Sequence, residues 1–507
     1  MNSLEAIVLL VGSSQFCSRE KLALKKSSFK LAVDTSSLFQ MWSKVLSLHP
    51  SFIFFELGHS YDSEYHRELR KILEQLRERF SNKIYLSLVI TDSRNLFYAG
   101  DLLFKQESLQ GSDLINSFIV LPPSSLPSAP SVAEQIIHTI SLLQENFESS
   151  GGTLGSVPAL NSESWVQSMA DPASKELWYR WLPRYARYTT ESPVIVGETG
   201  TGKTKLAFAV HQLSGREGKF LSITPRDFSS PELVQAELFG STAGAFTGAV
   251  DKWGIIKEVE KGTLFIDELQ SIDKDLQGKL ITFIENKIYR RVGSSQTTTA
   301  DVRFIFATNR KLYDLVEEGV LREDFSYRLE RIELRLLPLR KRKLDITAAA
   351  SFALAKIMRQ RPLKRLIKGL TPSAHRVLLN YNWPGNLRQL ENYLAKLCEL
   401  ADIEKEELIN QKTAREVIPY YSEIEAENSS EIFAQISQEL SQEALKGKFS
   451  SLEQIEDEFV KRARAFAYNL AEGDFKKASF LLKDNESLLK LFFFDSIESE
   501  QFKFKNN

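Results

Sequence analysis

The sequence predicts a multidomain α/β protein whose C-terminal part is helical. Its 507 residues exceed what one hydrophobic core usually serves, so roughly three domains are expected. Short apolar runs alternate with amphipathic stretches through about residue 145, and again from about Trp165 to Pro338. From Arg340 to about Glu406 the apolar residues follow a helical period. These patterns predict two α/β units followed by helical ones.

Five β-branched runs mark the strands of the first unit, which is predicted to have (βα)5 order. They are Ala6–Val11, Leu31–Val33, Phe52–Leu57, Ile84–Ile90 and Phe118–Leu121. We assign this unit to residues 1–147, and the Ser- and Gly-rich segment 148–163 to a linker. The later boundaries follow from changes of pattern and composition: an α/β unit over 164–338, a helical subdomain over 339–410, an acidic linker over 411–447 and a small all-α domain over 448–507.

Composition restricts the class of protein. A hydrophobic content of 43% and a charged content of 26% are typical of a soluble globular chain. The net charge of -1 excludes general attraction to nucleic acid, so any such contact needs a local patch. Cys17 and Cys398 have no metal-ligand spacing and suit a reducing compartment. Charges interrupt every apolar run before membrane-spanning length, so we expect a cytoplasmic protein without a membrane span.

A phosphate-binding loop follows the short strand Val194–Val196. Its residues, which lead into a helical pattern, are Gly197, Glu198, Thr199, Gly200, Thr201, Gly202, Lys203 and Thr204. Glycines let backbone N–H groups converge on a phosphate, Lys203 neutralises phosphate oxygens, and Thr204 is a magnesium ligand. Strand, loop and helix together predict an ATP site.

An acidic pair ends the apolar strand Thr263–Ile266. We assign Asp267 to magnesium binding, together with Thr204, and Glu268 to polarising the attacking water. Beside a phosphate-binding loop, this pair predicts an ATPase that uses ATP and Mg²⁺.

The run Gly244, Ala245, Phe246, Thr247, Gly248 and Ala249 stands about forty residues after that loop. It resembles the signature of the AAA+ activators of sigma-54 RNA polymerase, the bacterial enhancer-binding proteins. The resemblance implies that these six residues form a mobile, exposed loop whose Phe246 and Thr247 contact the sigma factor. The segment Arg291–Arg303 resembles the family's second pore loop and is expected to move with the first.

Three further motifs resemble the same family. Thr308 and Asn309 follow the strand Phe304–Ala307 where the family has its first sensor of the γ-phosphate. Leu321–Leu329 resembles the arginine-finger segment, which implies that Arg322 and Arg328 reach a neighbouring subunit in a ring, a hexamer by analogy. Tyr381–Arg388 resembles the second-sensor motif, which places Arg388 over the phosphates.

Two positions depart from the family pattern. Thr224 stands where relatives have an Asn that holds the catalytic Glu idle, so hydrolysis is expected to be less tightly coupled to the partner. Thr204 replaces a Glu, a change that favours magnesium binding.

The N-terminal unit resembles a response-regulator receiver in its order of elements but lacks the phosphotransfer residues. The expected acids, phosphoacceptor and Lys are replaced by Gly12–Ser14, Glu56–Gly58 and Pro122–Pro123. We interpret it as a pseudo-receiver that senses a ligand or partner or regulates assembly. Glu56 is either a mimic of a phosphorylated Asp or, as we favour, an ordinary strand-end acid.

The C-terminal helices faintly resemble a degenerate helix-turn-helix, with Phe475–Leu482 before a recognition helix at Glu486–Phe494. That second helix offers mainly Leu and Phe where base readout needs Arg, Lys, Asn or Gln, and the segment is acidic overall. DNA binding and a dimerisation or partner-docking role both stay open, and the sequence favours the second.

The resemblance thus implies an ATP-driven activator that remodels sigma-54 RNA polymerase. The alternative is a remodelling ATPase or regulatory partner of another activator, without specific DNA binding of its own. A nucleotide-binding scaffold without turnover does not explain why Asp267, Glu268, Arg322 and Arg388 occur together.

Overall fold

The computed structural model describes most of the chain up to residue 417. The described residues are 7–24, 30–34, 38–58, 62–80, 83–104, 114–123, 126, 128–150, 169–361, 363–417, 458 and 462. The chain divides into two units, residues 1–417 and residues 418–507, of which the first is described below. In the described part of the chain, no helix has both the length and the apolar character needed to cross a membrane.

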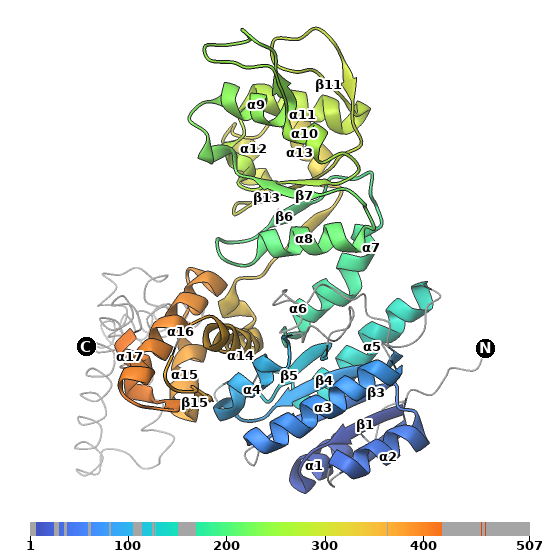
Figure 1. The fold of residues 1–507 in the computed structure, drawn as a ribbon, viewed down its shortest axis with the longest axis vertical. Coiled ribbons are helices and arrows are strands. Elements are labelled where there is room, and N and C mark those ends of the chain that lie inside the picture. Colours follow the sequence, from blue (N-terminus) through green and yellow to red (C-terminus); the bar gives the residue numbers. More distant parts are fainter. Residues whose placement is uncertain are drawn as a thin grey trace, which may run out of the picture. The chain divides into compact units, whose positions relative to one another are not determined.

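The N-terminal unit is a five-stranded parallel sheet in the order β2-β1-β3-β4-β5. Its strands are β1 Ile7–Val11, β2 Lys30–Asp34, β3 Phe52–Leu57, β4 Tyr85–Ile90 and β5 Ser117–Val120. Its helices, seen in blue to cyan in Figure 1, are α1 Ser14–Leu24, α2 Leu38–Leu48, α3 Ser63–Phe80, α4 Leu96–Asp101 and α5 Val132–Ser150, with a 3-10 turn η2 at Ser93–Asn95. All five predicted strands are confirmed to within one residue at each end.

Alternation along the strands gives this sheet two apolar faces, as expected when helices cover both sides of a parallel sheet. Val8, Leu10, Phe52 and Phe54 pack in one cluster with residues of α1 and α5. The intervening side chains, such as Ile53, are also fully buried. The predicted (βα)5 order is therefore what the chain forms.

The second unit has a parallel sheet in the order β14-β6-β13-β10-β7. Its strands are β6 Val194–Val196, β7 Phe220–Ile223, β10 Thr263–Ile266, β13 Arg303–Thr308 and β14 Glu333–Arg335. Short strands outside it are β8 Gly240–Ser241, β9 Lys252–Trp253, β11 Ile288–Tyr289 and β12 Thr298–Thr299.

Helices lie on both faces of this sheet (Figure 1). They are α6 Pro172–Glu176, a π-helical turn η4 Leu177–Trp181, α7 Leu182–Ala186, α8 Lys203–Leu213, α9 Pro231–Phe239, α10 Ile255–Glu258, α11 Lys274–Asn286, α12 Leu312–Glu317 and α13 Glu323–Leu329. Short 3-10 turns are η5 Pro225–Asp227 and η6 Leu269–Ser271.

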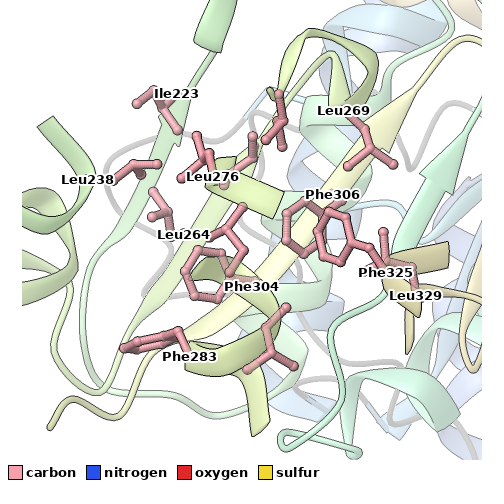
Figure 2. Close-up of a cluster of buried hydrophobic side chains, with 14 of the residues drawn as sticks. Ile223, Leu238, Leu264, Leu269, Leu276, Phe283, Phe304, Phe306, Phe325 and Leu329 are labelled. Carbon is pink, nitrogen blue, oxygen red and sulfur yellow. The ribbon is translucent and has the colours of Figure 1, made fainter. Parts of the chain in front are cut away.

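The main core of this unit lies on the α9–α13 face of the sheet. Figure 2 shows Phe304 and Phe306 of β13 among side chains of other elements, including Phe283 of α11 and Phe325 of α13. The Phe306 and Phe325 rings meet edge to face at 5.4 Å, an arrangement that adds to the stability from burial. This packing fixes the carboxyl ends of β10 and β13, where the predicted catalytic residues begin.

A helical subdomain follows, as the helical period after Arg340 predicts. Its elements are η7 Leu339–Lys341, α14 Lys343–Gln360, β15 Gly369–Leu370, α15 Pro372–Asn380, α16 Asn386–Ile403, β16 Leu408–Ile409 and α17 Gln411–Val417. Trp383, in the turn before α16, is fully buried and donates its indole N–H to the Leu378 carbonyl at 2.8 Å. The predicted C-terminal helices Phe475–Leu482 and Glu486–Phe494 lie outside the described residues.

Candidate nucleotide site

The predicted phosphate loop, acidic pair, first sensor and second sensor line one cleft of about 390 Å³ between the sheet and the helical subdomain. From the sequence-predicted set, the lining residues are Thr199, Gly200, Gly202, Lys203, Thr204, Asp267, Glu268, Asn309 and Arg388. Gly197, Glu198 and Thr201 of the loop are not among its lining residues. Segments almost 200 positions apart thus meet at the carboxyl ends of parallel strands, where α/β folds bind ligands.

Backbone conformation explains the glycines of the loop. Gly200 has φ +79° and Gly202 has φ +108°, a region that side chains with a Cβ rarely adopt. Gly202 directly precedes α8, so the loop ends at a helix N-terminus, which favours anions. Lys203 donates to the Gly197 carbonyl at 3.1 Å, and burial lowers the pKa of its ammonium group.

The acidic pair is oriented by its own backbone. Asp267 accepts the Glu268 N–H at 2.9 Å, and Glu268 has φ +57°, which is uncommon for a non-glycine residue. The Glu268 carboxylate forms an ion pair with Arg226, whose Nε lies 2.9 Å from Oε2. Thr224 lines the cleft as well. The basic partner of Glu268 is therefore Arg226, which lies two residues after Thr224, the position that departs from the family pattern.

The first sensor also has a partner that the sequence did not single out. Gln270 Nε2 donates to the side-chain oxygen Oδ1 of Asn309 at 3.3 Å, and Gln270 Oε1 accepts from the Thr308 hydroxyl at 3.0 Å. Gln270 itself lines the cleft. This amide links the strand end of β13 to η6 and orients Asn309.

The helical subdomain supplies an apolar wall. Ala349 and Phe352 of α14 and Leu387 and Leu390 of α16 line the cleft beside Arg388. Of these residues the sequence predicted only Arg388. The apolar ones cannot be told from ordinary core residues of amphipathic helices by their sequence pattern.

The two predicted arginine fingers do not line this cleft. Arg322, the residue just before α13, pairs with Asp324 at 2.7 Å on the protein surface. Arg328 has a buried Nε for which the described part of the chain supplies no hydrogen-bond acceptor. Neither Arg322 nor Arg328 therefore reaches this cleft.

The predicted contact loop Gly244–Ala249 is a pair of turns between β8 and β9. Thr247 is exposed, whereas Phe246, which was expected to be exposed at the loop tip, is half-buried. The loop folds back on itself, since the Ala249 N–H donates to the Phe246 carbonyl at 2.9 Å. Gly244 and Gly248, with φ +80° and +84°, permit these turns.

The second predicted loop is joined to the first by backbone hydrogen bonds. The Thr242 N–H donates to the Val292 carbonyl at 3.0 Å, and the Val292 N–H donates to that of Gly240 at 2.9 Å. A Cβ on Gly293 would lie 2.6 Å from the Cβ of Ala245. Such contacts favour movement of the two loops together.

In the N-terminal unit, Glu56 lies in a cluster of hydroxyl and backbone donors. Its Oε2 accepts the N–H and the hydroxyl of Ser13, both at 2.7 Å, and its Oε1 accepts the Thr91 hydroxyl at 3.3 Å. The glutamate is therefore held at the end of β3 and joined to the ends of β1 and β4.

The N-terminal unit also contacts the helical subdomain. The Ser93 hydroxyl donates to the Leu370 carbonyl at 3.0 Å, and the Phe97 N–H donates to that of Lys368 at 2.9 Å. Asp101 accepts a hydrogen bond from Arg359 of α14 at 3.1 Å. Nothing in the sequence predicts this contact, because its residues have no distinctive local spacing.

Comparison with known proteins agrees with this site. Residues 175–335 match the Sigma-54 interaction domain family, and residues 340–428 match the AAA+ ATPase lid domain family. These parts of the chain are therefore a Sigma-54 interaction domain and an AAA+ lid, which confirms the resemblance drawn from the motifs.

Three relatives illustrate the extent of the similarity. The alginate biosynthesis transcriptional regulatory protein AlgB of Pseudomonas putida is 41% identical over 44% of this chain and 50% of its own length. The Nif-specific regulatory protein of Azotobacter vinelandii is 43% identical over 44% of this chain and 42% of its own length. The regulatory protein LuxO of Vibrio vulnificus is 43% identical over 41% of this chain and 45% of its own length. The chain thus matches half or less of the length of each relative.

A crystal structure of NtrX from Brucella abortus in complex with ADP aligns over 96% of this chain and 99% of that one. Its TM-score is 0.44 and its sequence is 21% identical, values too low to transfer a function.

Proposed function

We propose that this chain, with its Sigma-54 interaction domain and AAA+ lid, hydrolyses ATP to remodel sigma-54 RNA polymerase at promoters. The observation that carries the proposal is the meeting of Lys203, Glu268, Asn309 and Arg388 around one cleft. The chemistry is phosphoryl transfer to water, in which positioning and electrostatic stabilisation do most of the catalysis.

Each residue has a distinct role. Lys203, with the loop N–H groups and Arg388, binds the phosphates. Glu268 accepts a proton from the attacking water once its carboxylate is free of Arg226, and Asn309 orients that water. The apolar lid wall of Phe352, Leu387 and Leu390 excludes bulk water from one side of the cleft.

Magnesium fits the donor set of this cleft. Thr204 and Asp267, a hydroxyl and a carboxylate, both line it, and hard oxygen donors are what Mg²⁺ prefers. When bound there, Mg²⁺ would supply positive charge to the phosphate oxygens.

The work on the polymerase is assigned to Gly244–Ala249. This loop follows α9, which packs against α10, and it is joined to the second loop through Val292. Thr247, which is exposed, is the proposed first contact with the sigma factor, and the half-buried Phe246 becomes available when the loop rises.

A homo-oligomeric ring, hexameric by analogy with the family, completes the site. The surface position of Arg322 supports a role at a neighbouring subunit, and Arg328 is assigned to the same role by the family resemblance alone. The chain acts in the cytoplasm, in line with its buried cysteines Cys17 and Cys398. We keep as the alternative a remodelling ATPase, or a partner of another activator, that has no specific DNA site.

Transcription by purified sigma-54 polymerase tests the proposal. Wild type should stimulate open-complex formation when ATP is present. An upstream DNA site should increase that stimulation only if the C-terminal segment binds DNA. Stimulation that is absent with and without upstream DNA, despite ATP hydrolysis, would favour the alternative.

Two variants test the assignment of the cleft. Lys203→Ala should abolish nucleotide binding because phosphate neutralisation is lost, whereas Glu268→Gln should bind ATP and lose about 10²–10⁴-fold in turnover. Undiminished turnover in Glu268→Gln would refute the role of that carboxylate.

A further inference from the structure

Three successive carbonyl groups of the phosphate-binding loop are each bound by a different donor of the lid. Asn386 Nδ2 donates to the Thr199 carbonyl at 3.0 Å. The Leu387 N–H donates to the Gly200 carbonyl at 3.0 Å. Arg342 Nη2 donates to the Thr201 carbonyl, also at 3.0 Å. A Cβ on Gly200 would lie 2.3 Å from the Gly385 carbonyl oxygen, so its glycine allows the lid backbone to approach this closely.

Because of the geometry of the peptide group, these contacts also orient the backbone N–H groups of the phosphate loop. A peptide group is planar and trans, so its carbonyl and the following N–H point in opposite directions. Holding the carbonyls of Thr199 and Thr201 from the lid side therefore aims the N–H groups of Gly200 and Gly202 away from the lid donors. Both glycines line the nucleotide cleft.

The two side-chain donors are themselves held rigidly. Asn386 is fully buried, and its Oδ1 accepts the Leu339 N–H at 2.7 Å. Arg342 is 1% exposed and pairs with Asp345 at 3.5 Å. Asp345 in turn accepts the N–H of Ala170 at 2.8 Å. Each donor thus has a further buried contact, and hydrogen-bond networks of this kind favour one local arrangement.

We propose that Asn386 and Arg342 are positioning residues for nucleotide binding, which act through the backbone of the phosphate loop and not on the nucleotide itself. The inference rests on the proposed ATPase function and adds that the placement of the lid sets the affinity of the loop. Arg388 lines the cleft, whereas Asn386, two residues earlier, contacts the backbone of the phosphate loop on the side away from the cleft.

Asn386→Asp is the sharpest test. Aspartate keeps the acceptor for the Leu339 N–H and tolerates the φ of +50°, but it removes the donor to Thr199 and adds repulsion with Glu198, whose Oε2 lies 3.2 Å from Nδ2. The Kd for a fluorescent ADP analogue should rise about tenfold, as expected for losing one hydrogen bond and gaining a like charge. The kcat at saturating ATP should stay within about twofold, because Glu268 and Asn309 belong to the core sheet.

Asn410→Asp is the matched control. Asn410 also accepts a backbone N–H, from Thr413 at 3.0 Å, and also donates to a glutamate, Glu406. It lies in the lid away from the cleft, so this variant should bind the analogue as wild type does. A weakening equal to that of Asn386→Asp would show general lid damage and overturn the proposal.

Arg342→Lys is the second variant and decides the matter if Asn386→Asp fails to fold. Lysine keeps a charge beside Asp345 but shortens the reach to the Thr201 carbonyl, so the Kd should rise several-fold with kcat preserved. If wild type binds no analogue, the proposed function fails. If wild type binds and both folded variants bind equally well, the proposed function stands and the positioning role is wrong.

Discussion

Phe104 of the N-terminal unit stacks on Phe352 of the lid helix α14, with ring centroids 5.3 Å apart and planes 7° from parallel. Phe352 also lines the nucleotide cleft. One aromatic pair therefore connects the N-terminal unit to the wall of the candidate site, and Arg359 lies over the Phe104 ring at 4.6 Å. A change at this contact would therefore reach a residue of the cleft wall.

Gly100→Ala should separate these two units. The added Cβ would lie 1.9 Å from the Ser351 carbonyl oxygen and 2.5 Å from the Ser351 carbonyl carbon, and no rotamer can relieve a clash with backbone. Amide hydrogen exchange in α14 should rise, and the clash should cost about 1–3 kcal/mol of stability. Gly278→Ala, whose new Cβ would meet only the end of Arg322 at 3.2 Å, is the control. Unchanged exchange in α14 would show that the units do not dock through α4.

Arg226→Gln should raise basal ATP hydrolysis. In the proposed mechanism the ion pair with Glu268 keeps that carboxylate from the attacking water, and a pair whose side chains are 66% and 33% exposed is weak enough to be broken reversibly. We expect kcat to increase about two- to fivefold with KM unchanged, and Arg226→Lys to behave as wild type.

Lys219→Gln is the control for this change. Lys219 is equally exposed, at 66%, and pairs with Glu258 at the opposite end of β7. A fall in kcat for Arg226→Gln would mean that Arg226 supports the reaction instead of restraining Glu268.

Thr247→Ala should uncouple hydrolysis from promoter opening. Thr247 is exposed on the loop and does not line the cleft, so ATP turnover should stay within about twofold of wild type while open-complex formation stops. Thr190→Ala, at an exposed threonine outside both loops and the cleft, should retain both activities. Normal activation by Thr247→Ala would place the partner contact elsewhere.

Arg322→Ala should reduce turnover by about 10³-fold without weakening nucleotide binding, because the residue lies outside its own cleft. Mixing it with Lys203→Ala subunits should restore part of the activity, since an intact finger then faces an intact phosphate loop at some interfaces. Full activity of wild type as a dilute monomer would rule out this trans-acting role.

The local sequence patterns of the chain were enough to predict most of its secondary structure and the order of its elements. Strand β3 at Phe52–Leu57 and strand β10 at Thr263–Ile266 have the predicted bounds, because period and side-chain type are properties of neighbouring residues. The loop from Gly197 to Thr204 was predictable for the same reason, since its glycines and Lys203 occur at fixed spacing.

The sequence by itself therefore determined the α/β class, the order of elements and the residues that meet at the strand ends. Tertiary structure alone decided which groups restrain them: Arg226 on Glu268, Gln270 on Asn309, and Asn386 on Thr199. It also half-buried Phe246, which the sequence predicted to be exposed. These contacts join residues that are distant in the chain and of common types, so packing selects them from many equivalent side chains and no local spacing marks them.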